Sequence, residues 1–78
     1  MMDQIPKLPE PFRDRVASFP ESSMGANRIK IDLSNGQRVY DVFIAGDGTI
    51  VKIGNKMIEN LEDLEFSPSD ITNVTSEI

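Results

Sequence analysis

The sequence holds few residues that could carry out catalysis or bind a metal. It has neither histidine nor cysteine, so the commonest general base and every thiolate ligand are missing. Glu59, Glu62, Asp63 and Glu65 stand close together, and their charge alone would suit calcium. A calcium loop also needs alternating oxygen ligands around a central glycine, which this stretch lacks. We interpret the stretch as a solvated acidic face and predict no catalytic residue, no metal site and no cofactor.

Two other patterns resemble binding motifs. Gly46, Gly48 and Gly54 lack the helix and the Lys-Ser or Lys-Thr pair of a phosphate-binding loop, so we interpret them as turn residues. Residues 6–9 match the bare PxxP ligand pattern, which arises readily by chance in a proline-rich segment. Neither pattern predicts a site.

Charge and composition indicate which partners and which cellular location to expect. The net charge is −5, and residues 57–78 hold 6 acidic residues and no basic one. An acidic chain disfavours nucleic acid, because binding to phosphates depends on concentrated Lys and Arg. Neither a membrane-spanning apolar run nor a signal peptide is visible, and cysteine is absent. We expect a cytoplasmic protein with no membrane partner.

The length of 78 residues provides for one small domain. Residues 1–10 are proline-rich and are predicted to form an extended tail, and residues 11–78 form the domain. Pro11 is expected to open a short helix with Phe12 and Val16 on one face. That face extends to Phe19. So short a helix is stable only when it docks on another element.

A β-hairpin is predicted after the helix, because apolar residues alternate with polar ones from Arg28 onward. Asn35-Gly36 and Asp47-Gly48 are typical of type I′ turns, which fix the pairing of the strands on either side. The predicted opposite residues are Arg28 and Phe43, Ile29 and Val42, Lys30 and Asp41, Ile31 and Tyr40, Leu33 and Arg38, Ile44 and Val51, Val42 and Ile53, and Phe43 and Lys52.

These pairings assign an inner and an outer face to the sheet. The residues predicted inside are Ile29, Ile31, Val42, Ile44, Val51 and Ile53. The residues predicted outside are Val39, Phe43, Ala45 and Ile50, with Arg28 and Lys52 on either side of Phe43.

Two further strands complete the prediction. Residues 57–61 are expected to form a fourth strand, with Ile58 inside and Glu59 facing Lys52. After a helical turn opened by Pro68, residues 71–75 form a fifth. The predicted fold is mainly β: a small five-stranded antiparallel SH3-like (Sm-like) barrel with a short N-terminal helix.

The run from Ile29 to Gly36, with alternating aliphatic residues leading into Asn-Gly, resembles the first strands of the Sm-like family. That resemblance implies the small barrel shared with Src-homology-type modules, over residues 28–75. Asp41 stands where Sm-like strands usually carry glycine, and residues 57–66 lack the Arg-Gly signature of RNA contact. The pattern of residues 66–71, Phe-x-Pro-x-Asp-Ile, is also similar to small bacterial proteins with a helix and a barrel.

The outer apolar residues leave two alternatives: the N-terminal helix covers them, or a partner does. The candidate interaction surface comprises Arg28, Val39, Phe43, Ile50 and Lys52. We expect a non-enzymatic protein-interaction or accessory module that binds a protein partner or a second copy of itself. The alternative is an Sm-like oligonucleotide (RNA) binder, which would use Lys30 and Arg38 as well.

Overall fold

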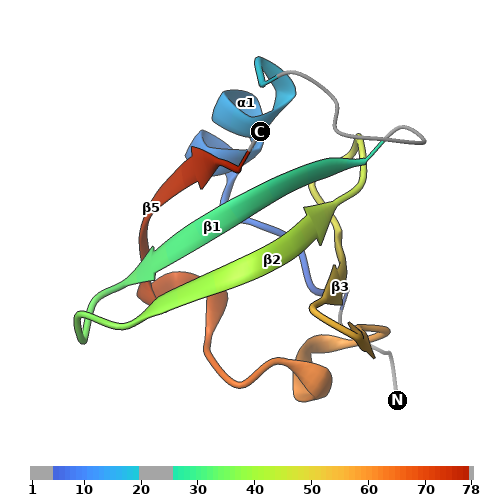
Figure 1. Ribbon diagram of the computed structural model, residues 1–78, viewed down its shortest axis with the longest axis vertical. Coiled ribbons are helices and arrows are strands. Elements are labelled where there is room, and N and C mark those ends of the chain that lie inside the picture. Colours follow the sequence, from blue (N-terminus) through green and yellow to red (C-terminus); the bar gives the residue numbers. More distant parts are fainter. Residues whose placement is uncertain (1–4, 20–25, 78) are drawn as a thin grey trace.

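The computed structural model describes residues 5–19 and 26–77. One α-helix, a set of β-strands and two short 3-10 turns follow one another along the chain (Figure 1). Their bounds are α1 Glu10–Ala17, β1 Asn27–Leu33, β2 Arg38–Ile44, β3 Ile50–Ile53, β4 Lys56–Met57, η1 Leu61–Asp63, η2 Pro68–Asp70 and β5 Ile71–Ser76.

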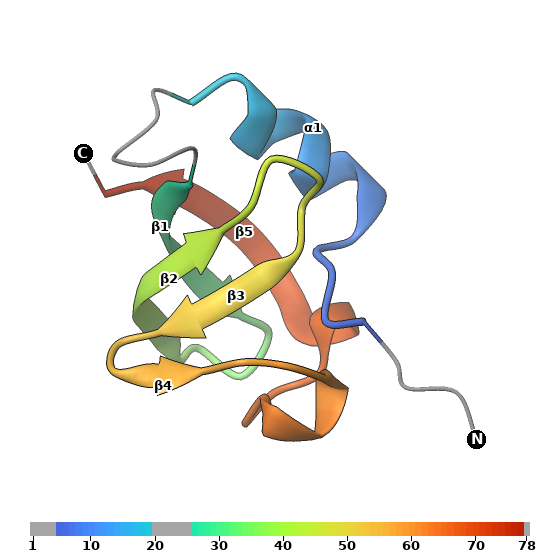
Figure 2. The ribbon, with the colours of Figure 1, turned by 90° about the vertical axis from the view of Figure 1, so that its right-hand side faces the viewer.

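The strands form one antiparallel sheet with the order β4-β3-β2-β1-β5. The first four make a meander, and β5 returns to lie beside β1 (Figure 2). The predicted mainly β class, the meander of the first four strands and the short helix are therefore confirmed. The sheet does not close into the predicted barrel, because β4 and β5 are edge strands that do not pair with each other. With only two residues, β4 offers too few backbone groups for closure before the chain turns into η1.

Both predicted hairpin turns lie at the right place, but their type I′ geometry is wrong. In the first turn, Gly36 N–H donates to Leu33 O at 3.0 Å, and Leu33 N–H donates to Gln37 O at 2.8 Å. Gly36 has a φ of 90°, whereas Asp41 is the one non-glycine among the described residues with positive φ. A type I′ turn needs positive φ at Asn35 as well, so the loop is of the longer kind that closes on a left-handed glycine.

The second turn repeats this geometry. Gly48 N–H donates to Ala45 O at 2.9 Å, and Ala45 N–H donates to Thr49 O at 2.8 Å. Gly48 also has a φ of 90°. The Asp47 carboxylate accepts Thr49 N–H at 3.0 Å, and hydrogen bonding from Thr49 lowers the pKa of Asp47 below its ordinary value. Each longer turn shifts the pairing beside it by one residue.

The predicted pairings far from these turns are confirmed. They are Arg28 with Phe43, Ile29 with Val42, Phe43 with Lys52, and Val42 with Ile53. Bulges closer to the turns absorb the shift and restore the expected register.

Near the first turn the predicted pairings are wrong. Ile31 lies opposite Val39 instead of Tyr40, and the expected pair of Lys30 and Asp41 does not form. Asp41 has a φ of 55°, and this left-handed residue lies within the bulge. Val39 consequently faces inward and packs against the core. The expected pair of Leu33 and Arg38 is also replaced, since Arg38 lies opposite Asp32.

Near the second turn and in β4, two further registers differ from the prediction. Ile44 lies opposite Ile50 instead of Val51. Ile50 is fully buried while Val51 is half-buried, so the side chain predicted to point outward belongs to the core. In β4, Met57 rather than Glu59 lies opposite Lys52.

Part of the predicted extended tail contributes to the core. Ile50 N–H donates to Pro6 O at 2.7 Å, and Leu8 N–H donates to Gly48 O at 3.0 Å. These bonds hold residues 5–9 against the start of β3, with Leu8 only 1% exposed. Residues 1–4 of the tail lie outside the described residues.

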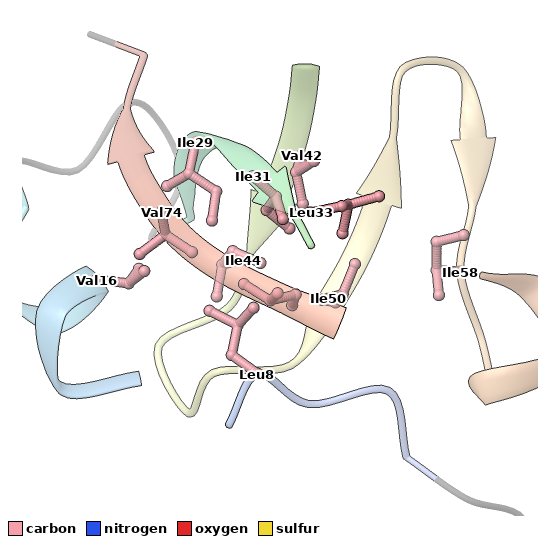
Figure 3. Packing of buried hydrophobic residues seen from close by; sticks show 11 residues of the cluster. Leu8, Val16, Ile29, Ile31, Leu33, Val42, Ile44, Ile50, Ile58 and Val74 are labelled. Carbon is pink, nitrogen blue, oxygen red and sulfur yellow. The ribbon is translucent and has the colours of Figure 1, made fainter. Parts of the chain in front are cut away.

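The core lies on the inner face of the sheet (Figure 3). Its buried side chains are Leu8, Val16, Ile29, Ile31, Leu33, Val42, Ile44, Ile50, Ile58, Ile71 and Val74. Ile58 is inside, as predicted. Val16 places the helix on this inner side, and Phe12 and Phe19 pack against the same cluster. The interpretation that the helix covers Phe43 on the outer face is therefore wrong.

Asn27 secures the end of the helix. This residue is buried at 7% exposure, and its Nδ2 donates to Phe19 O at 3.2 Å and to Val16 O at 3.4 Å. Asn27→Ala should lower the free energy of unfolding by about 1–3 kcal/mol, because buried carbonyls lose their donor. Urea unfolding measures the change. Exposed Glu62→Ala is the control, with an expected effect below about 0.5 kcal/mol, and equal effects would contradict this role of Asn27.

Candidate functional site

The structure divides the predicted interaction surface. Arg28, Phe43 and Lys52 lie opposite one another on adjacent strands and share the outer face. Val39 and Ile50 do not belong to it, because the two bulges turn them toward the core. The surface is therefore narrower than predicted and consists of one aromatic residue with a cation on the strand at each side.

Met57 extends this surface by one strand. It lies opposite Lys52, faces the same side and is 64% exposed. We name Arg28, Phe43, Lys52 and Met57 the outer row. At about 4.8 Å between neighbouring strands, the row crosses roughly 14 Å of sheet. The sequence analysis missed Met57 because it placed Glu59, two residues further along the chain, opposite Lys52. A two-residue turn at Gly54-Asn55 would have placed Met57 there.

The centre of the row is a contact between a cation and an aromatic ring. Lys52 Nζ lies 5.4 Å from the centroid of the Phe43 ring, a distance at which the ammonium is attracted to the ring face. Both side chains are half-buried. The contact fixes a charged group over an apolar one on a strand surface, where side-chain positions vary less than on a loop.

Arg28 is held at the other side of the ring. Its Nη2 donates to Glu77 O at 3.1 Å, just beyond the end of β5. Its Nε is buried and has no hydrogen-bond partner among the described residues. The hydrogen bond to Glu77 O thus anchors the guanidinium on the strand next to Phe43.

A strained backbone residue adjoins the row. Asp41 N–H donates to Glu77 Oε1 at 2.7 Å, so the Glu77 side chain reaches across β1 to the bulge of β2. The left-handed φ of Asp41 costs free energy for a residue with a side chain, and such strain is concentrated at functional sites. The same bulge separates Phe43 from Tyr40, which is 54% exposed.

The charges on this face are only partly balanced. Arg38 Nε and Asp32 Oδ1 form an ion pair at 2.6 Å, and this bond raises the pKa of Arg38 above its ordinary value. Arg28, Lys30 and Lys52 on this face have no ion-pair partner among the described residues.

A hollow lies between the inner face of β2 and β3 and the segment that follows β4. It has a volume of about 170 Å³, which suits a single side chain, and its lining comprises Val39, Ile53, Lys56, Ile58, Asp63, Glu65 and Phe66. Asp63 Oδ2 accepts the backbone N–H groups of Glu59 and Asn60, at 2.9 and 3.3 Å. This carboxylate therefore caps η1, so its position has a local structural cause.

Other kinds of site find little support in the described part of the chain. Residues 5–19 and 26–77 contain no group of three or more side chains suited to holding a metal ion. No helix within those ranges is long and apolar enough to cross a membrane.

Comparisons with known proteins give no relative from which a role could be transferred. No protein-family model matches the chain, and neither the curated proteins nor the solved structures contain a significant match. The geometry of the outer row is therefore the basis for assigning a function.

Proposed function

We propose that this chain is a non-enzymatic interaction module that binds a protein partner through the outer row. The observation that carries the proposal is a phenylalanine flanked by two cations on a sheet face that the described helix does not cover. In Figure 1, β1 and β2 cross the front of the molecule with no helix before them.

The composition of the row supports a protein partner. Arginine, aromatic residues and methionine are enriched at protein interfaces, and the row contains all three types. Phe43 and Lys52 are already in contact, which reduces the side-chain ordering that binding would require. Met57 adds an exposed, adaptable apolar group at the edge of the sheet.

We propose further that the fold is an opened relative of the SH3-like or Sm-like barrel. The meander, the helical turn before β5 and the pairing of β5 with β1 support this relation. Asp41 supports it as well, since its φ of 55° is one that glycine adopts freely. This is the residue that replaces the usual glycine of Sm-like strands.

The second candidate function is oligonucleotide binding, and the position of Phe43 favours it. An aromatic ring beside unpaired cations can stack on a base while the cations contact phosphates. Against it, the net charge is −5, and Asp41 and Glu77 add carboxylates beside the row.

A phage-displayed random peptide library tests the proposed function. We expect peptides selected on the wild type to bind Phe43→Ser at least roughly tenfold more weakly, because the apolar centre of the interface is lost. Thermal unfolding of both proteins verifies that the variant is folded. Enrichment of no peptide, or equal binding by wild type and variant, would refute the proposal.

A further inference from the structure

We infer that the segment recognised by the outer row is acidic and places an apolar side chain between its carboxylates. This inference rests on the proposed function and adds the chemistry of the partner. It follows from the charge of the face, from the order of groups along the row, and from the consequence of pairing two copies.

The local charge of the face favours an acidic partner. Arg28, Lys30 and Lys52 have no ion-pair partner among the described residues. The nearby carboxylates are Asp32, which is paired with Arg38, and the neighbouring Asp41 and Glu77, which share a hydrogen bond from Asp41 N–H to Glu77 Oε1. The face therefore holds one more cation than carboxylates, whereas the whole chain has a net charge of −5. A local field of this kind favours and orients an anionic partner.

The order of the groups along the row matches an apolar side chain between two carboxylates. Arg28 and Lys52 lie on β1 and β3, with Phe43 between them on β2. Two strand spacings separate the cations' backbones by roughly 10 Å. A partner that sets one apolar side chain against Phe43 can thus direct a carboxylate to each side. Met57, at the end of the row, offers a second apolar contact.

Like charges disfavour a second copy of the chain as the partner of this face. Two-fold pairing through the same face would place each Arg28 and Lys52 against the same cations of the other copy. Burying like charges without counter-ions is unfavourable. Charge complementarity therefore favours a different, acidic chain over a symmetric dimer.

The probes are two fluorescein-labelled peptides, Asp-Glu-Leu-Glu-Asp and its amide counterpart Asn-Gln-Leu-Gln-Asn, and labelled oligouridine. Fluorescence anisotropy at low and physiological salt measures their binding to the full chain. We expect the acidic peptide to bind at least roughly tenfold more tightly than its amide counterpart, and its affinity to fall with salt.

Two charge reversals locate the binding surface. Lys52→Glu should weaken binding of the acidic peptide by roughly tenfold or more. The matched control is Lys56→Glu, which changes the net charge equally but lies opposite Ile53 and lines the hollow on the other side of the sheet. We expect a change of less than about threefold for this control, since exposed charges at a distance are screened. If Lys52→Glu fails to fold, Lys52→Gln takes its place in the same measurement.

Each contrary result has a distinct meaning. Equal binding of the two peptides, or equal loss in both reversals, would overturn the inference while leaving the interaction module intact. Oligouridine binding that requires Lys52 would also overturn it, in favour of the second candidate function. A molecular mass that rises with concentration and falls in Phe43→Ser would show that a second copy occupies the row and would overturn the inference. Failure to bind any library peptide would instead refute the proposed function itself.

Discussion

Replacing Ile50 with alanine should lower the free energy of unfolding by about 2–5 kcal/mol, the range for large-to-small changes in a closed core. Ile50 is fully buried, and its backbone N–H is also bonded to Pro6 O. The substitution removes side-chain atoms from the buried cluster to which Leu8 and Ile44 also belong (Figure 3). Chemical denaturation followed by circular dichroism measures the loss.

The neighbouring residue provides a control for this prediction. Val51 is half-buried and lies in the bulge where the β2–β3 register shifts. Val51→Ala should therefore cost less than about 1.5 kcal/mol, as expected for a partly exposed β-branched residue. A regular hairpin with Val51 opposite Ile44 would reverse the order of the two effects. The pair of variants thus distinguishes the bulged register from the simple one.

Replacing Gly48 with alanine should destabilise the protein by about 2–5 kcal/mol, since two costs combine. The φ of 90° is unfavourable for any residue with a Cβ. The added Cβ would also overlap Cγ and Cδ of Arg13, so α1 would have to move away from the turn. The thermal unfolding midpoint of the variant should fall accordingly.

Gly36 is the matched control for Gly48. It has the same φ of 90° in the equivalent turn, but nothing lies within 4 Å of an added Cβ. Gly36→Ala should show only the conformational cost, about 1–2 kcal/mol. The difference between the two variants measures the contact between α1 and the second turn. Equal effects would show that the helix does not depend on this close approach.

Local patterns in the sequence were sufficient for the elements and for part of the site. Alternation of apolar and polar residues located β1 and β2, and glycines located both turns. The pairings of Phe43 with Arg28 and with Lys52 were correct. They were correct because each bulge cancels the one-residue shift that its neighbouring turn introduces.

Tertiary structure decided which side chains occupy the inner face and what covers them. Val39 and Ile50 turn inward because the backbone bulges, and a period of two contains no signal for a bulge. Leu8 enters the core through backbone bonds to a turn distant in sequence. The pattern of an amphipathic helix predicts that one of its faces is buried, but not which surface that face packs against. The packing of α1 through Val16 on the inner face of the sheet could therefore not be predicted. Because α1 packs on the inner side, it leaves the outer row uncovered. Met57 belongs to that row because β4 pairs with β3 so that Met57 lies opposite Lys52, and this register is defined only by the paired strands.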